Sequence, residues 1–213
     1  MLHAERLCKT YGSRVILHDL EVQVDAGEIV GIIGANGAGK TTLFRILCNL
    51  IAADSGVVSV AGSESGARAP WSDIGYLPEA RSLFPEVTVG RSLEFWSAMR
   101  GMTRSDAVRA RDLWLGKIGL LDRASHRVSS LSKGNLQKLQ IAACMLHSPK
   151  VLVLDEPFSG LDPVNQVAVV ELISAAARQG AAVLLSAHHI ELLQRFCGRI
   201  LVLKNAQLQP AKA

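Results

Sequence analysis

Residues 34–42, Gly-Ala-Asn-Gly-Ala-Gly-Lys-Thr-Thr, combine glycines, a lysine and hydroxyls in the spacing of a phosphate-binding loop. The glycines let successive backbone N–H groups curl around an anion, and a helix that begins after them adds partial positive charge. Lys40 can reach the β- and γ-phosphates of a nucleoside triphosphate, and the Thr41 hydroxyl can bind Mg²⁺. The residues that we expect to bind nucleotide are Gly34, Asn36, Gly37, Gly39, Lys40, Thr41 and Thr42.

The segments on either side of this loop decide how it is interpreted. Strand-forming residues at 28–33 precede it, and a helical pattern at 41–48 follows it. This strand–loop–helix order is the setting in which the pattern binds phosphate; the alternative is a glycine-rich turn that binds nothing. The loop alone leaves kinase, GTPase and motor functions open.

A second chemical cluster lies at residues 151–157, Val-Leu-Val-Leu-Asp-Glu-Pro. Four apolar residues followed by two carboxylates describe a buried strand that ends in a ligand-binding crevice. Asp155 is placed to hold Mg²⁺ through water, and Glu156 can polarise a water for attack on the γ-phosphorus. A single carboxylate here would more simply cap a helix. The pair, in a chain with a phosphate loop, favours nucleotide hydrolysis.

Apolar runs must position these two clusters. The segments 151–154, 181–185 and 200–203 predict strands buried on both faces, as in a parallel sheet. A helical pattern at 164–178, ended by Gly180, lies between the first two strands. We therefore expect a right-handed βαβ arrangement in an α/β fold.

Two other kinds of pattern flank this core. Alternating residues within 15–24 and at 56–61 predict short strands of a more hairpin-like region, which makes the whole sheet system mixed. The stretch 92–121 is helical in character, and Ser105–Asp106 is a plausible cap for its second helix.

Composition bounds the class of protein. The chain has 213 residues, 49% of them hydrophobic, but contains no run of about 20 apolar residues that could cross a membrane. Its start lacks the continuous apolar centre of a secretory signal, so we expect a cytoplasmic protein. A net charge of +4 fits an anionic partner, which could be nucleotide, nucleic acid or an acidic membrane face. The cysteines form no CxxC pair, and we interpret them as small apolar residues in a reducing compartment.

Further motifs appear in a fixed order along the whole chain. They are Tyr11, Gly75-Tyr-Leu-Pro-Glu79, Leu131-Ser-Lys-Gly-Asn135, Ser159-Gly-Leu-Asp162 and Ser186-Ala-His188. With the phosphate loop and the two carboxylates, this order resembles the ATP-binding subunit of an ABC transporter. The resemblance implies one ATPase domain over residues 1–213: a phosphate-loop core of mixed, largely parallel sheet, an antiparallel β subdomain, and a helical subdomain at about 85–145.

The resemblance also implies that each ATP is bound between two chains. The Ser132 hydroxyl and the Gly134 N–H of a second chain would cap the γ-phosphate held by the first; otherwise these residues form a simple helix N-cap. His188 would hydrogen-bond the γ-phosphate and hold Glu156 with the attacking water. The spacing from Ser186 favours His188 over the adjacent His189.

The resemblance also implies roles for residues that have a simpler alternative or that replace the usual residue of the family. Tyr11 would stack on adenine, although a tyrosine before glycine often only begins a turn. Asp162 closes the loop after the second carboxylate. Glu79 replaces the usual glutamine and would bind the metal or raise a neighbouring pKa. Lys133 replaces a glycine, and Asn135 a glutamine, in the segment that caps the phosphate.

The implied activity is ATP hydrolysis with ATP and Mg²⁺ as cofactors. The implied partners are a second ATPase subunit, expected as a homodimer, and a membrane-embedded permease that works in export. The chain would then lie on the inner face of the cell membrane, and no nucleic-acid partner is expected. The alternatives are a soluble ABC-type ATPase that acts on ribosomes or DNA, and a degenerate regulatory subunit that binds nucleotide without hydrolysis.

Overall fold

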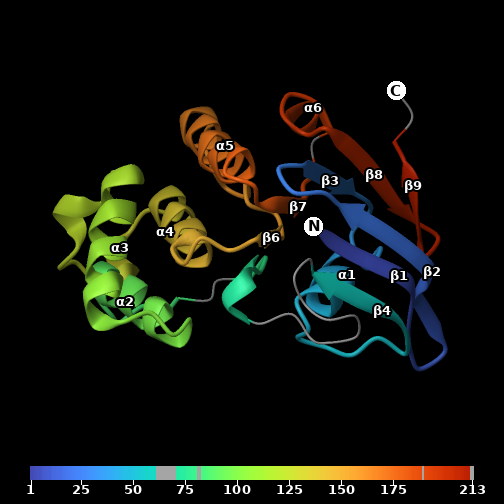
Figure 1. The fold of residues 1–213 in the computed structure, drawn as a ribbon. Coiled ribbons are helices and arrows are strands. Elements are labelled where there is room, and N and C mark those ends of the chain that lie inside the picture. The colour runs from blue at the N-terminus through green and yellow to red at the C-terminus, as the bar shows by residue number, and fades with distance from the viewer. Residues whose placement is uncertain (61–70, 81–82, 189, 212–213) are drawn as a thin grey trace.

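The computed structural model describes residues 1–60, 71–80, 83–188 and 190–211, which form two β-sheets with helices around them (Figure 1). The smaller sheet has the strand order β2–β1–β4, and the larger has the order β5–β6–β7–β3–β8–β9. The strands are β1 (Leu2–Tyr11), β2 (Arg14–Val24), β3 (Ile29–Ile33), β4 (Ser55–Val60), β5 (Ile74–Leu77), β6 (Val151–Leu154), β7 (Ala182–Ser186), β8 (Arg199–Lys204) and β9 (Gln207–Pro210). The helices are α1 (Lys40–Leu47), α2 (Val89–Met99), α3 (Arg104–Lys117), α4 (Lys133–Met145), α5 (Pro163–Arg178) and α6 (Ile190–Leu193), with 3-10 turns at Trp71–Asp73, Leu121–Arg123 and Val128–Ser130.

The larger sheet is the middle layer of the molecule. Val151 and Val153 of β6 pack with α1 and the smaller sheet, whereas Leu152 and Leu154 pack with α2–α5. Figure 1 shows the same division, with the smaller sheet on one side of the larger and the helices α2–α5 on the other. Because both faces are covered, the strand is apolar at every position. The predicted α/β fold, with a mixed sheet and an antiparallel β region, is confirmed.

Parallel pairing aligns the ends of three strands. β3 pairs with β7, with Ile32 opposite Ser186, and β6 pairs with β7, with Leu154 opposite Leu185. The segments that follow β3, β6 and β7 therefore leave the sheet at one edge. This edge, outside the carboxyl ends of parallel strands, is where such sheets bind ligands.

The smaller sheet contains a strand, β1, that the sequence pattern does not predict. β1 pairs with both β2 and β4, but its register shifts several times, and Arg6 has a φ of 49°. These bulges break the alternation of buried and exposed residues, so the sequence pattern of a strand is lost. β4 ends at Val60, and position 61 of the predicted strand lies outside the described residues.

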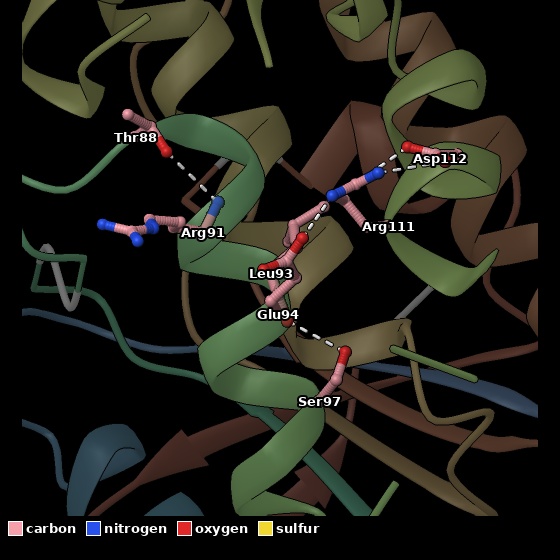
Figure 2. Close-up of polar contacts among 7 residues, drawn as sticks. All are labelled: Thr88, Arg91, Leu93, Glu94, Ser97, Arg111 and Asp112. Atoms are coloured by element: carbon pink, nitrogen blue, oxygen red, sulfur yellow. Dashed lines mark hydrogen bonds and ion pairs between the residues drawn. The ribbon is translucent and has the colours of Figure 1, made fainter. Parts of the chain in front are cut away.

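The helical region contains α2, α3 and α4. Arg111 of α3 forms ion pairs with Glu94 of α2 and with Asp112 (Figure 2), and the distance to Asp112 is 2.8 Å. Within α2, the Thr88 hydroxyl accepts a hydrogen bond from the Arg91 N–H. The α2–α3 pair is therefore joined by a partly buried ionic contact as well as by packing.

The predicted cap of α3 was wrong. Thr103, not Ser105 or Asp106, is the N-cap; its hydroxyl accepts from the Asp106 N–H at 3.2 Å. The Asp106 carboxylate in turn accepts from the Thr103 hydroxyl at 2.6 Å. The threonine is the N-cap because it lies directly before the first residue of the helix, where its oxygen reaches the amide three residues later.

No helix in the described part of the chain is long and apolar enough to cross a membrane. All four cysteines are free; Cys48 and Cys144 are buried, and Cys8 and Cys197 are partly exposed. Burial raises the pKa of the Cys144 and Cys197 thiols to about 12. These two thiols are therefore protonated and unreactive at neutral pH, as small apolar residues are.

Candidate functional site

The phosphate loop connects β3 to α1 at the ligand-binding edge of the sheet. Gly37 and Gly39 have φ angles of 73° and 110°, in the left-handed region that favours glycine. A Cβ on Gly39 would also lie 2.8 Å from the Cγ2 atom of Ile16. The loop can take this shape only with glycine at 39, immediately before the first turn of α1.

Lys40 begins α1, and only 8% of the residue is exposed. Its ammonium donates hydrogen bonds to the carbonyl oxygens of Gly34, at 2.7 Å, and Ala35, at 3.4 Å. Within the described residues, no ion pair joins Lys40 to a carboxylate. The lysine is thus a mostly buried cation that lies along its own loop, and no carboxylate of a described residue neutralises it directly, which suits an anion site.

A cavity of about 300 Å³ opens over this loop. It brings together residues that are far apart in the sequence, from the loop, from the segment after β5, and from the ends of β6 and β7. The lining residues are Ile16, Asn36, Gly37, Ala38, Gly39, Lys40, Thr41, Thr42, Glu79, Asp155, Glu156 and His188.

Asp155 is the centre of a hydrogen-bond network at the bottom of the cavity. Its two carboxylate oxygens accept from the Thr41 and Ser186 hydroxyls, each at 2.7 Å. Ser186 also accepts a hydrogen bond from the Glu156 N–H at 2.9 Å. This supporting role of Ser186 was not predicted. The available signal is a small polar residue at the end of an otherwise apolar strand.

Thr41 and Asp155 offer two oxygen ligands, and Glu79 lies on the same cavity wall. The described residues contain no cluster of three acidic, histidine or cysteine side chains that could hold a metal alone. Mg²⁺ does not need one, because it commonly takes one or two protein oxygens together with phosphate and water. The donors present fit such an ion.

Glu156 follows Asp155 and also lines the cavity. Its φ is 53°, which is unusual for a residue other than glycine, and its Oε1 is buried without a hydrogen-bond donor among the described residues. His188 Nε2 lies 3.3 Å from this oxygen, a charge contact whose geometry is not that of a hydrogen bond. Burial raises the pKa of Glu156, while His188 and Lys40 oppose the rise and Asp155 and Glu79 add to it.

Tyr11, the expected adenine platform, does not line this cavity. It ends β1 with half of its surface exposed, and Lys9 lies 5.5 Å from the centre of its ring. A second hollow lies beside the phosphate loop and includes Arg14, His18 and Ala206. Tyr11 is thus a half-exposed residue outside the cavity, with a lysine ammonium over its ring.

Ser132, Gly134 and Asp162 also lie outside the cavity. Ser132 is the N-cap of α4 and accepts from the Asn135 N–H at 3.3 Å. Asp162 is the N-cap of α5, and hydrogen bonds from Asn165 lower the pKa of its carboxyl. One chain thus contains both expected halves of the site but does not join them. His189, the alternative histidine, lies outside the described residues.

Comparison with known proteins gives a consistent family. The sequence model described as "ABC transporter" matches residues 17–159. An uncharacterised ABC transporter ATP-binding protein of Methanocaldococcus jannaschii is 37% identical over 97% of this chain and 75% of its own length. The linearmycin resistance ATP-binding protein of Bacillus subtilis is 30% identical over 98% of this chain and 68% of its own length. The Nod factor export ATP-binding protein I of Bradyrhizobium diazoefficiens is 35% identical over 92% of this chain and 65% of its own length.

Solved structures agree with these relatives. The structure of an ATP-binding subunit of an ABC transporter superimposes with a TM-score of 0.89 and 31% identity, over 100% of this chain and 89% of the other. A dimeric ATP-binding cassette, bound to ADP and Pi in a post-hydrolysis state, shares the fold with a TM-score of 0.87, 23% identity and full coverage of both chains. The chain therefore belongs to the ABC transporter family, as an ATP-binding subunit with ATPase activity.

Proposed function

We propose that this chain hydrolyses ATP as one half of a dimer, in which each nucleotide lies between the phosphate loop of one copy and residues 131–135 of the other. The observation that carries the proposal is the division of the site. The cavity holds Lys40, Thr41, Asp155 and Glu156, whereas Ser132 and Gly134 lie outside it at the exposed start of α4. A helix N-terminus that carries no acidic side chain in its first turn suits the γ-phosphate of a second copy.

Within the cavity the roles follow from position and charge. Lys40 and the loop N–H groups would bind the β- and γ-phosphates, because Lys40 and the loop residues line the same cavity. Thr41 and Asp155 would hold Mg²⁺, with Glu79 as a further oxygen donor. When bound, the ion neutralises charge on the phosphate oxygens.

Glu156 would take the proton of the attacking water. A base must be ionised to accept a proton, and a pKa raised above the ordinary value gives it the basicity that this step needs. His188, 3.3 Å away, would hold the carboxylate in place and contact the γ-phosphate. Tyr11 would stack on adenine, and Asp162 would keep the loop after Glu156 in position by capping α5.

The partner outside the dimer would be a membrane-embedded permease. Export is the proposed direction, because relatives of this chain are named for Nod factor export and linearmycin resistance. Residues 1–213 would act as one ATPase domain, with the helical subdomain at about 85–145, where α2, α3 and α4 lie. The subunit would sit at the cytoplasmic face of the membrane, and no step of the proposed cycle requires nucleic acid.

Mixing two inactive variants tests the shared site. In Lys40→Ala the loop loses its cation; in Ser132→Asp the N-cap acceptor is kept but a negative charge faces the phosphate. Each variant alone should release almost no phosphate. Because random pairing leaves one intact site in mixed dimers, the mixture should recover about a quarter of the unaltered rate. Mixing that recovers nothing, at concentrations where the unaltered chain is active, would contradict a site shared between copies.

His188→Ala should move the acid limb of the pH–rate profile toward higher pH. His188 lowers the pKa of Glu156, so its removal lets that pKa rise further. Since the ionised form is the base, the rate then begins to fall at a higher pH than in the unaltered chain. The measurement is kcat across the acidic and neutral range, with the exposed His126→Ala as the matched control. If the acid limbs of the His188→Ala and His126→Ala profiles coincide, His188 does not lower the pKa of the base.

A further inference from the structure

α4 contacts the loop that directly follows Glu156. The Gln137 side-chain amide of α4 donates a hydrogen bond to the Pro157 carbonyl oxygen at 3.0 Å, in a partly buried position. Pro157 is the next residue after the carboxylate proposed as the base. Ser132 is the N-cap of the same helix, so one element connects the exposed N-cap with the backbone behind Glu156.

The backbone of Glu156 needs such support. Its left-handed φ of 53° persists in a residue with a side chain only where the surroundings hold it. The Ser186 hydroxyl accepts a hydrogen bond from the Glu156 N–H at 2.9 Å, and the Glu156 carbonyl accepts one from the Ser159 N–H at 3.1 Å. Gln137 holds the following carbonyl. Of these three contacts, the one from Gln137 is the one that comes from the helical layer.

The same loop also approaches the start of α4 at a second place. The Lys133 side chain lies directly over Gly160: a Cβ built on this glycine would be 2.2 Å from the Lys133 Cε. Gly160 has a φ of 71°, so glycine also suits its backbone. The loop after Glu156 therefore lies against α4 at two places, and at the first of them the Gln137 hydrogen bond to the Pro157 carbonyl joins the two.

The carboxylate itself has few contacts that could fix its direction. Oε1 of Glu156 is buried and accepts no hydrogen bond from a described residue, and its near neighbour is the half-exposed His188. Its direction is therefore set largely by the backbone on either side. A general base must come within about 2.6–3.2 Å of the proton donor it serves, so a small shift of the backbone at 156–158, where Gln137 binds the Pro157 carbonyl, is enough to misplace it.

We propose that Gln137 is a positioning residue: its hydrogen bond to Pro157 sets the direction of Glu156, and it connects the start of α4 to the proposed base. This inference rests on the proposed function, in which residues 132–134 contact the nucleotide of a second copy. Docking of that copy onto the start of α4 then affects the position of Glu156 through the helix and one hydrogen bond.

Gln137→Glu gives a readout that a purely structural role would not move. An ionised glutamate cannot donate to the Pro157 carbonyl, whereas a protonated one can. At neutral pH kcat should fall by about tenfold or more, because misplacement of a catalytic group is costly, while KM for ATP changes little. As the pH is lowered, the ratio of the variant kcat to the unaltered kcat should rise. Gln137→Met, which cannot donate at any pH, should keep a constant low ratio.

Gln166→Glu is the matched control. The Gln166 amide donates to the Leu161 carbonyl at 3.2 Å, so it makes the same kind of bond to the far end of the same loop, but from α5. Its kcat ratio should stay near one and independent of pH. Equal ratios for the Gln137→Glu and Gln166→Glu chains would overturn the inference, as would a Gln137→Glu ratio that does not rise on acidification.

The outcome also separates this inference from the proposed function. If the unaltered chain hydrolyses ATP and the mixed Lys40→Ala and Ser132→Asp chains recover activity, the proposed function stands. A normal kcat for Gln137→Glu then overturns the positioning role alone. If the mixture recovers nothing while Gln137→Glu shows its pH-dependent loss, the shared site fails but the support of Glu156 by α4 remains.

Discussion

Glu156→Gln should abolish ATP turnover and leave ATP binding intact. The amide has the shape of the carboxylate but cannot accept the proton of the attacking water, and loss of a general base costs roughly 10²–10⁴ in rate. Lys40, Thr41 and Asp155, which face the phosphates and metal in the proposed complex, are unchanged. Phosphate release at saturating Mg²⁺ and ATP measures the first effect, and equilibrium titration with ATP measures the second.

Loss of folding would not account for this result. The pKa of Glu156 is raised in the folded chain, so ionisation at neutral pH favours the unfolded state, and the neutral amide removes that cost. The thermal midpoint of Glu156→Gln should therefore equal or exceed that of the unaltered chain. Glu171→Gln, an exposed change of the same kind on α5, should keep full activity. A Glu156→Gln chain that turns over ATP at the unaltered rate would refute the assigned base.

The parts of the fold that are local in sequence were predictable. The phosphate loop, its strand and its helix are contiguous, and the runs at 151–154 and 200–203 are apolar because both faces of the larger sheet are covered. α5 begins one residue before its predicted start, and Gly180 follows its end with a φ of 99°. In each case one short segment carries the whole signal.

Tight packing concealed β5. A Cβ on Gly75 would lie 2.3 Å from the Cys144 carbonyl oxygen of α4, so this strand can approach the helix only with glycine in its interior. Glycine within a short segment is typical of a turn, so the residues at 75–79 do not by themselves predict a strand. The contact that explains the glycine lies about seventy residues away along the chain, where no local pattern can reveal it.

The parts of the candidate site that lie in short motifs were predictable, and the contacts that depend on packing between distant segments were not. Lys40, Thr41, Asp155 and Glu156 stand in short motifs, and the fold gathers them with Glu79 and His188 around one cavity. The supporting bonds from Ser186 to Asp155 and from Gln137 to Pro157 join residues from different elements. Their donors are common side chains whose partners are set only by the packing of the sheet and α4.

Lys40→Ala should weaken ATP binding by about 100-fold or more. Hydrogen bonds to charged groups contribute about 1.5–3 kcal/mol each, and the ammonium can serve both the β- and the γ-phosphate. In the structure the same ammonium donates to the Gly34 carbonyl at 2.7 Å and is mostly buried, and it has no direct carboxylate partner among the described residues. Binding therefore moves a charge that is already desolvated onto a better acceptor, and alanine removes that gain. Calorimetric titration with ATP gives the affinity.

Lys150→Ala is the control, because it removes the same charge from an exposed residue whose partner is Asp73. If the loss of affinity reflected only the net charge of the chain, both variants would lose it equally; the proposed contact predicts a large loss for Lys40→Ala alone. Its fold should survive, since the freed Gly34 carbonyl can accept from water that enters the cavity. An ATP affinity shared by the two variants would mean that the phosphates lie elsewhere, and the assignment of the cavity over the loop would fail with it.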